Sequence, residues 1–374
     1  MRIAFITSHI YKSTQWNWFS EELLQRGISH IHIIISDDYP LMADELEKKG
    51  VRVFVLPHHS KLSLLTNLFK IIKILKQEKI DLVHTELPYG NLLGQTAALL
   101  AGIKRRITTC ENASWAIDNN NRKQLWIDKL TYQLAKKIIV LTDLSKQYLI
   151  KNYTVPEHKL ITIWHALKTE AYQDISLQRI EKLKNELQVK EDEFILGMVA
   201  RGEEWKGHIY AIKAIALLKN KYPNLRLIIA GIDETEKYGK QLRDYIFNNH
   251  LSDYIRLIRF VTDNVALYRM FQIHIHVPVD EISETFGITY IEGMISDCPQ
   301  IITHSGISCF TAKHLENSYV VDYKNEKQVA EGIEYLVENS DARIKIAENA
   351  KRLAENLFLY SDKVNKHLEL YRTL

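Results

Sequence analysis

Residues 277–302 read VPVDEISETFGITYIEGMISDCPQII, and this stretch decides the fold class. An apolar run reaches Val277, as at the end of a buried strand, and a polar loop follows. Apolar residues then recur at the three- and four-residue spacing of one helix face, at Ile288, Ile291 and Ile295. The stretch therefore predicts a strand, a loop and a helix, with Gly287 at the helix entrance.

The predicted helix entrance is a candidate anion site. The first amides of a helix have no partner within the helix and carry partial positive charge, so they can hold a phosphate. Glu284 lies just before the helix and Glu292 in its second turn. Ionised carboxylates accept hydrogen bonds from sugar hydroxyls, so the pair favours a nucleotide sugar with its diphosphate at the helix. On spacing alone, an ordinary strand–loop–helix with two tolerated Glu residues explains the stretch equally well.

These residues resemble the E-x7-E signature of glycosyltransferase family 4, with Phe286 and Gly287 between the acids and Pro299 after them. The resemblance implies a retaining, metal-independent enzyme of the GT-B fold, an α/β architecture of two Rossmann-like doubly wound domains facing an interdomain cleft. It also implies that Glu284 is catalytic and orients the hexose. The donor-binding residues that it implies are Glu292, Phe286, Gly287, Ile288 and Thr289.

Arg201 and Lys206 form a second motif, in the loop after a predicted strand at 194–199. Arg can neutralise a diphosphate with a two-pronged fork and Lys as a point charge. The pair resembles the family's Arg-x4-Lys-Gly element, which holds the donor's diphosphate. The resemblance implies catalytic roles for both cations through stabilisation of the leaving group's charge, and we assign no protein nucleophile. Two solvated loop cations are the alternative.

Five residues stand where the family usually has others, one of them Asp233, which replaces the second glycine of the family's Gly-x-Gly turn. His9 follows the first predicted strand without the usual glycines, and Glu111 stands in place of a His that contacts the donor sugar. His165 lies where a Pro-Asn-Gly turn is usual. These three are candidate acceptor or sugar contacts, although structural roles are favoured for the two histidines. Arg259 replaces a glycine near the expected nucleobase site, where it either stacks on the base or points to solvent.

Short β-rich runs alternate with helical patterns along the whole chain, which predicts βαβ units and parallel sheets. We expect an acceptor-binding domain at 1–170, a nucleotide-sugar-binding domain at 171–355, and a helix at 356–374 that packs back on the first domain. Ligands of such folds lie at the carboxyl ends of the strands, so the cleft between the domains is the expected active site.

The composition fits a cytoplasmic protein. The chain has 374 residues, 46% of them hydrophobic, but no apolar run of the ~18 residues that a membrane span needs, and no signal peptide pattern. Its three cysteines are widely spaced, as in a reduced compartment. The alternating histidine pairs His30/His32 and His274/His276 lack further ligands at metal spacing, so no metal site is expected.

The first 170 residues are basic and the remainder is acidic. Within the basic part, a predicted helix at 63–79 has Lys70 and Lys73 opposite an apolar face. That face is expected to comprise Leu64, Leu65, Leu68, Ile71, Ile72 and Leu75. A basic amphipathic helix can lie on anionic lipid, and an ordinary sheet-covering helix fits about equally well. Further basic residues at 104–106 and 136–137 tilt the interpretation towards a membrane surface.

We therefore expect a hexosyltransferase that moves a sugar from a nucleotide diphosphate sugar to a hydroxyl of a glycan or lipid-linked acceptor in surface polysaccharide biosynthesis. It needs no cofactor, has no nucleic acid partner, and is cytoplasmic with peripheral attachment to the inner face of the membrane as a candidate. A nucleotide-sugar epimerase, a glycan phosphorylase or a non-catalytic binding subunit of the same fold are the alternatives.

Overall fold

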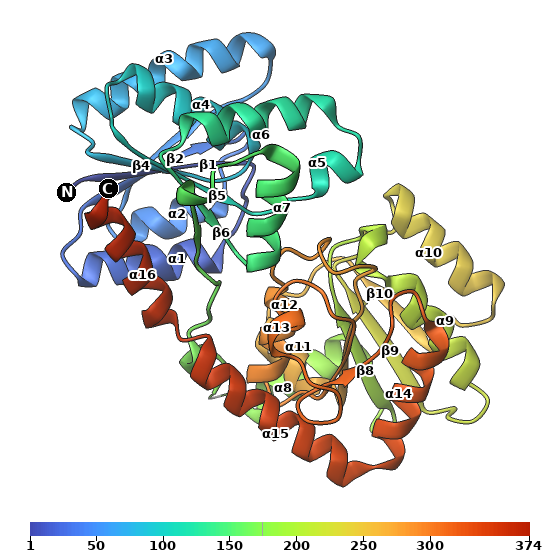
Figure 1. Cartoon of the computed structure of the whole chain (residues 1–374). Coiled ribbons are helices and arrows are strands. Elements are labelled where there is room, and N and C mark those ends of the chain that lie inside the picture. The colour runs from blue at the N-terminus through green and yellow to red at the C-terminus, as the bar shows by residue number, and fades with distance from the viewer. Residues whose placement is uncertain (174) are drawn as a thin grey trace. The chain divides into compact units, whose positions relative to one another are not determined.

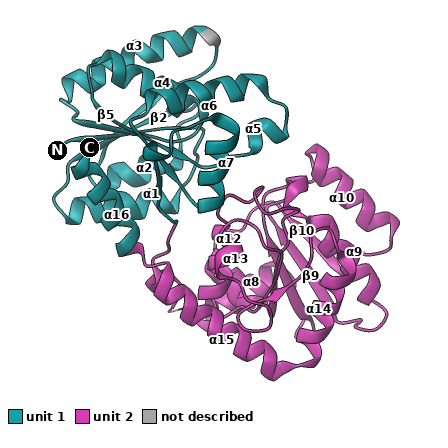
Figure 2. Ribbon diagram, in the orientation of Figure 1, with its two compact units in different colours: residues 1–164, 361–374 teal, residues 165–360 magenta. Residues whose placement is uncertain are grey.

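The computed structural model describes residues 1–173 and 175–374. The chain divides into two compact units, of which unit 1 holds residues 1–164 and 361–374 and unit 2 holds residues 165–360 (Figure 2). The chain crosses between the units after residues 164 and 360, and not after residues 170 and 355 as expected. Contacts between the two crossing segments explain the difference. Leu167 forms a bridge with Leu359, and its amide donates to the carbonyl of Phe358, so both crossing segments stay paired within unit 2.

Unit 1 is built on a sheet with the strand order β3-β2-β1-β4-β5-β6-β7, and neighbouring strands pair in parallel. Its central strands are buried along their whole length, as expected for a parallel sheet covered on both faces. The strands are β1 (Ile3–Ser8), β2 (His30–Ile35), β3 (Arg52–Leu56), β4 (Leu82–Thr85), β5 (Arg105–Cys110), β6 (Lys137–Val140) and β7 (Leu160–Thr162).

Helices cover both faces of this sheet, with α3, α4 and α6 on one face and α1, α2 and α16 on the other (Figure 1). The C-terminal helix belongs to unit 1 because it binds there: the Tyr371 hydroxyl lies 2.6 Å from His84 Nδ1. The helices are α1 (Thr14–Gln25), α2 (Leu41–Lys48), α3 (Lys61–Gln77), α4 (Pro88–Leu100), α5 (Trp115–Asp118), α6 (Arg122–Leu134), α7 (Asp143–Tyr153), the 3-10 turn η1 (Glu157–Lys159) and α16 (Tyr360–Thr373).

Helix α3 departs in part from the expected pattern. Ile71 and Leu75 are buried against the sheet, as expected. Leu65, however, is 54% exposed, and Leu62 and Phe69 are 70% and 64% exposed. The expectation that Leu65 belongs to the buried face is wrong, because residues three and four apart share a face and Leu65 falls with Leu62 and Phe69. Within the described chain, no helix is long and apolar enough to cross a bilayer.

Unit 2 repeats the architecture with the strand order β10-β9-β8-β11-β12-β13, and its strands also pair in parallel. Strands β8 and β11 are neighbours, so the loops that follow them meet at the same edge of the sheet. The strands are β8 (Phe194–Val199), β9 (Leu225–Ala230), β10 (Ile255–Ile258), β11 (Ile273–His276), β12 (Gln300–Ile302) and β13 (Tyr319–Val320).

Two apolar layers enclose the unit 2 sheet. One core joins its strands to α9, α10, α14 and α15, and the other joins them to α8 and α11; Figure 1 shows α9 and α14 beside β8 and β9. The helices are α8 (Leu177–Glu186), α9 (His208–Leu218), α10 (Lys237–Asn248), α11 (Asn264–Met270), α12 (Ile288–Ile295), α13 (Ser308–Thr311), α14 (Glu326–Glu338) and α15 (Ser340–Leu357), with 3-10 turns η2 (Thr169–Tyr172) and η3 (Glu204–Lys206).

Candidate active site

The loop after β8 presents two cations at the carboxyl edge of the unit 2 sheet. Arg201 is exposed, whereas Lys206 is 9% exposed and its ammonium lies 4.2 Å from the centre of the Trp205 ring. Gly207 follows with φ 79°, and a Cβ there would lie 2.0 Å from the carbonyl oxygen of Val277. Only glycine therefore lets this loop pack against the end of β11.

Lys206 and Glu284 form a buried ion pair that joins the loops of two neighbouring strands. Lys206 Nζ donates to Glu284 Oε2, and the two side chains are 10% and 11% exposed. The family resemblance implied that the cation and the acid share one site. The structure brings them together because β8 and β11 are neighbours that end at the same edge. In the ligand-free protein Lys206 is not a free cation; its charge is compensated by Glu284.

The entrance of α12 lies beside this pair. Gly287 has φ 90°, and a Cβ there would lie 3.3 Å from Glu284 Cγ. Phe286 is 3% exposed, while Ile288 and Thr289 are partly exposed in the first turn. The N-cap residue Gly287 has no side chain that could cap this helix, and the first amides of a helix have no partner within the helix. The entrance has the polarity that an anion requires.

His276 is a site residue that the sequence did not identify. It is 2% exposed at the end of β11, its Nδ1 lies 3.3 Å from the Thr289 hydroxyl, and its Nε2 lies 3.9 Å from Glu284 Oε2. Burial and the nearby charge of Lys206 hold the pKa of His276 well below 6.5, so the ring is neutral. Nε2 has no hydrogen-bond partner in the described part of the chain, and its position just before the loop of Glu284 was the available signal.

Glu292 lies in the second turn of α12, and its carboxylate accepts two hydrogen bonds. The hydroxyl of Tyr172 donates to Oε1 at 2.9 Å and that of Tyr268 to Oε2 at 3.1 Å. Burial raises the pKa of Glu292, against the lowering effect of both tyrosines. Each carboxylate oxygen keeps a second lone pair, so a ribose hydroxyl could share Glu292 only by joining or displacing a tyrosine.

Arg259 forms an ion pair with an acid on the neighbouring loop. Its Nε lies 2.9 Å from Asp233 Oδ2, although its side chain is 81% exposed. Asp233 follows β9 and Arg259 follows β10, which is the neighbouring strand. Both residues stand where the family resemblance leads one to expect glycine, and the structure shows that the two departures pair with each other.

The three candidate acceptor or sugar contacts lie in different units. His9 and Glu111 follow β1 and β5 of unit 1, and His9 contacts His58 and Tyr89 at centroid distances of 5.8 and 5.6 Å. His165 belongs to unit 2 and packs edge-to-face on Phe286 at 5.3 Å. Phe286 precedes the entrance of α12, so His165 belongs with the unit 2 site.

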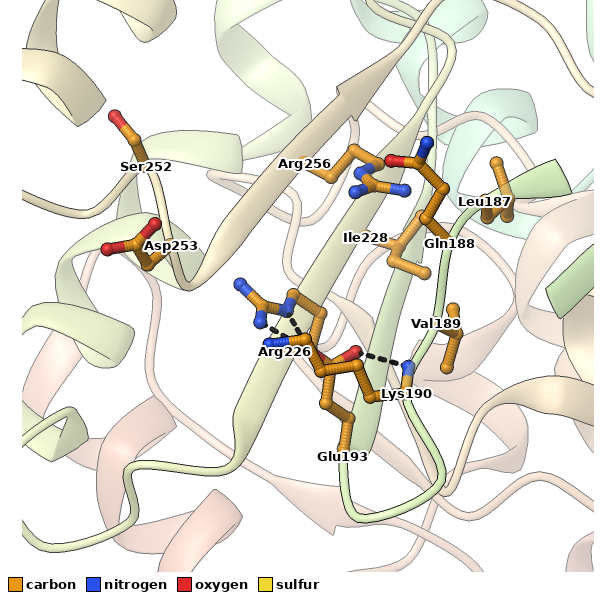
Figure 3. A pocket seen from close by; sticks show the side chains of 10 residues that line it. All are labelled: Leu187, Gln188, Val189, Lys190, Glu193, Arg226, Ile228, Ser252, Asp253 and Arg256. Carbon is orange, nitrogen blue, oxygen red and sulfur yellow. Dashed lines mark hydrogen bonds and ion pairs between the residues drawn. The ribbon is translucent and has the colours of Figure 1, made fainter. Parts of the chain in front are cut away.

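A separate pocket of about 280 Å³ lies at the opposite edge of the unit 2 sheet (Figure 3). It is lined where β8, β9 and β10 begin, by side chains that include Glu193, Arg226 and Arg256. Arg226 pairs with Glu193, and Lys190 donates its amide to the same carboxylate. The pocket therefore belongs to the amino ends of the strands and contains none of the candidate active-site residues.

Across the described chain, no three His, Cys, Asp or Glu side chains gather as metal ligands.

Two parallel sheets with flanking helices, one in each unit, are the architecture of the GT-B fold, and the cation–acid pair lies at the carboxyl edge of the unit 2 sheet, where ligands of such folds bind. Two family models match the chain, the one described as Glycosyl transferases group 1 over residues 179–353 and the one described as Glycosyltransferase Family 4 over residues 19–171. The chain belongs to glycosyltransferase family 4.

Relatives and solved structures agree with this assignment. The chain is 25% identical over 347 residues to the capsular polysaccharide biosynthesis glycosyltransferase CapM of Staphylococcus aureus, covering 90% of this chain and 88% of that protein. It is 22% identical over 364 residues to the UDP-Gal:alpha-D-GlcNAc-diphosphoundecaprenol alpha-1,3-galactosyltransferase of Escherichia coli, covering 94% and 90%. The crystal structure of Anabaena Alr3699/HepE in complex with UDP and glucose has the same fold, with a TM-score of 0.86 at 19% identity over the whole of both chains.

Proposed function

We propose that this glycosyltransferase moves a hexose-type sugar from a nucleotide diphosphate sugar to a hydroxyl of a glycan or lipid-linked acceptor, with retention of the anomeric configuration. The observation that carries the proposal is the contact of Lys206 with Glu284 beside the uncapped entrance of α12. This arrangement places a cation, an acid and helix amides within one small site. Those are the groups that a diphosphate joined to a sugar needs.

The donor's diphosphate lies, in this proposal, at the first amides of α12 and between the two cations. The Lys206 ammonium has three donors, so it can hold Glu284 with one and phosphate oxygens with the others. Arg201 is exposed and can add a two-pronged contact. Negative charge grows on the diphosphate as the sugar leaves, and fixed donors stabilise that charge more than they stabilise the intact donor.

Glu284 orients the hexose and Glu292 the ribose, the latter together with Tyr172 and Tyr268. Neutral His276 adds a donor or an acceptor at the sugar–phosphate junction. The positive charge that a divalent cation would supply comes here from Arg201, Lys206 and the helix entrance. We therefore propose a metal-independent reaction, which should proceed unchanged in the presence of a chelator.

The acceptor and the place of action are proposed from unit 1. Helix α3 carries lysines at positions 70, 73 and 76 and no carboxylate, and its exposed face bears Leu62, Leu65 and Phe69. Apolar side chains among lysines fit the interface of an anionic bilayer. The Escherichia coli relative is named for an acceptor linked to diphosphoundecaprenol. We propose a lipid-linked acceptor in surface polysaccharide biosynthesis, reached from the cytoplasmic side of the membrane.

The test is the release of nucleoside diphosphate. The protein is incubated with a panel of UDP-, GDP- and ADP-sugars, with and without octyl glycosides as soluble acceptors, and the product's anomeric configuration is read by NMR. Acceptor-dependent release with a retained configuration supports the proposal. Conversion of the donor sugar without acceptor would indicate an epimerase instead, and binding of nucleoside diphosphate without turnover would indicate a non-catalytic subunit.

A further inference from the structure

A cluster of ionisable side chains in unit 1 is not used by the donor site. Its centre is Glu86, which directly follows β4 and whose amide donates to the carbonyl of Ile6 in β1 at 3.0 Å. Side chains of Trp16 and Thr109 donate hydrogen bonds to its carboxylate. Glu86 therefore lies at the carboxyl edge of the unit 1 sheet, where ligands of such folds bind.

A chain of hydrogen bonds runs from α16 through His84 to Thr109, which contacts Glu86. Thr109 Oγ1 lies 2.7 Å from His84 Nε2, and His84 Nδ1 lies 2.6 Å from the hydroxyl of Tyr371 in α16. Burial lowers the pKa of His84 to about 3, so its ring is neutral. With Glu86 ionised and accepting from Thr109, His84 donates from Nε2 and accepts from Tyr371 at Nδ1. All three donors of the chain point towards the carboxylate.

Two further charged residues complete the cluster. Glu111, after β5, and Lys363, in α16, both act on the charge of Glu86. Burial and the negative charge of Glu111 raise the pKa of Glu86, and burial lowers the pKa of Lys363 to about 8 against the attraction of the two acids. The cluster thus holds two carboxyl groups for one ammonium group.

A purely structural role accounts poorly for this arrangement. Replacing charged groups in a protein interior by apolar ones is often neutral or stabilising, so stability alone does not call for it. Glu86, Glu111 and Lys363 all remain partly exposed, so a ligand can reach them. The residue after Glu86, Leu87, has φ 65°, a strained conformation of the kind that gathers at functional sites.

We propose that Glu86, Glu111 and Lys363 bind the hydroxyl groups of the acceptor sugar. Each carboxylate oxygen can accept more than one hydrogen bond, so the two acids can accept from vicinal hydroxyls, and the ammonium donates to a ring or hydroxyl oxygen. The ligand class is a neutral glycoside, since an anionic acceptor would meet two carboxyl groups. The inference rests on the proposed transferase function for its meaning, but glycoside binding can be measured without turnover.

The experiment measures binding of octyl glycosides to the full chain by saturation-transfer NMR, beside UDP binding by calorimetry. The variants are Glu86→Gln, Lys363→Met and the double variant. The control is Glu157→Gln, since Glu157 is an exposed acid of unit 1 that pairs with Lys146. We expect glycoside affinity to fall about ten-fold or more in Glu86→Gln, as for the loss of one strong hydrogen bond, with UDP affinity unchanged. The control should bind both ligands as the wild type does.

The double variant separates binding from structure. If the cluster only stabilises the fold, Lys363→Met unfolds at lower denaturant, the double variant recovers, and glycoside binding recovers with it; this result would overturn the proposal. If the cluster binds the acceptor, the double variant regains stability but not glycoside affinity. Unchanged glycoside binding in Glu86→Gln, or no binding by the wild type to any glycoside of the panel, would also overturn it. Binding that depends on Glu86 in a protein without transfer activity would refute the proposed reaction alone.

Discussion

Lys206 donates to Glu284 across 78 positions of sequence, and both side chains are about nine-tenths buried. The contact connects the loop of Arg201 and Lys206 with the loop of Glu284, so the two motifs form one site. Each partner fixes the orientation of the other's side chain. In the absence of donor the pair satisfies itself, and a diphosphate must share the ammonium with the acid.

Removing the cation should therefore affect stability and binding together. Lys206→Met leaves Glu284 buried without its partner, which costs about 3–5 kcal/mol for such pairs, and should lower nucleoside diphosphate affinity about 10- to 100-fold. Urea unfolding and calorimetry measure the two effects. Lys240→Met is the matched control, because Lys240 is an exposed lysine of α10.

The double variant Lys206→Met/Glu284→Gln tests the coupling. It should regain part of the stability lost in Lys206→Met, because no buried charge remains unpaired. It should not regain diphosphate affinity. Stability losses that simply add would contradict a direct interaction between the two side chains.

Arg201 should behave differently because it is exposed. Arg201→Ala is expected to change the free energy of unfolding by no more than about 0.5 kcal/mol. Nucleoside diphosphate affinity should still fall about ten-fold if the guanidinium reaches a phosphate. Equal affinities of wild type and variant for UDP, GDP and ADP by calorimetry would remove Arg201 from the site.

Gly207 holds the loop of Lys206 against β11. Gly207→Ala should destabilise the protein by at least about 1–2 kcal/mol, because φ 79° is unfavourable for alanine and the added Cβ would lie 2.0 Å from the Val277 carbonyl oxygen. Diphosphate affinity should fall as Lys206 is displaced.

Gly202→Ala, five residues earlier in the same loop, controls for this substitution. A Cβ there meets Ile232 Cδ1 at an ordinary 3.5 Å, and no left-handed φ is required. Unfolding and diphosphate binding of Gly202→Ala should match those of the wild type. Similar losses in both variants would show that the loop tolerates no added methyl group, whatever the contact with Val277.

The order of elements explains how far the sequence could predict this site. Strands β8 and β11 were both recognisable as apolar runs, and the family resemblance of the two motifs implied that Lys206 and Glu284 share a site. That the two strands are neighbours is shown only by the structure. The tyrosines that bind Glu292 were not predictable. Tyr172 and Tyr268 lie far from it in sequence, and their spacing carries no periodic signal.

Two single departures were ambiguous for a related reason. Asp233 and Arg259 each replace an expected glycine, and each alone could be a solvated loop residue. Their ion pair depends on the adjacency of β9 and β10, which the sequence does not state. Leu65 was assigned to the wrong face because it lies at the border of the apolar face of α3. At such a border the sequence pattern does not distinguish a side chain that packs on the sheet from one that faces solvent.

His274 should make the stability of unit 2 depend on pH. It is fully buried beside Gln300, and burial lowers its pKa to about 4. Below pH 6.5 His274 is protonated in the unfolded chain but not in the folded protein. The free energy of unfolding therefore falls by about 1.4 kcal/mol per pH unit until the pKa of the folded state is reached. His274→Asn removes this proton uptake.

The variant is expected to be less stable than the wild type at neutral pH, with a difference that shrinks on acidification. Urea unfolding at about pH 7 and about pH 5 should show the difference fall by about 2 kcal/mol. Other titrating groups shift the unfolding curves of the wild type and the variant equally, so their contribution cancels in the difference between the two proteins. A difference that stays constant with pH would mean that His274 takes up its proton in the folded protein as readily as in the unfolded chain.

Helix α3 makes the membrane proposal testable without knowledge of the substrate. Leu65→Glu/Phe69→Glu places two acids on a face that bears lysines and no carboxylate. Each large apolar side chain that enters the interface contributes about 1.5–3 kcal/mol, and each nearby lysine about 1 kcal/mol on anionic lipid. We expect at least a ten-fold loss of binding to vesicles of phosphatidylcholine and phosphatidylglycerol in a sedimentation assay.

Phe247→Glu is the matched control, because Phe247 is a 72% exposed aromatic residue in α10 of unit 2. It should sediment with the vesicles as the wild type does. Wild-type binding should also weaken in vesicles without phosphatidylglycerol and at high salt, since screening removes the lysine contribution. If the α3 variant sediments like the wild type, the exposed apolar face has another partner. A change of oligomeric state in that variant, seen by light scattering, would identify a second copy of the chain as that partner.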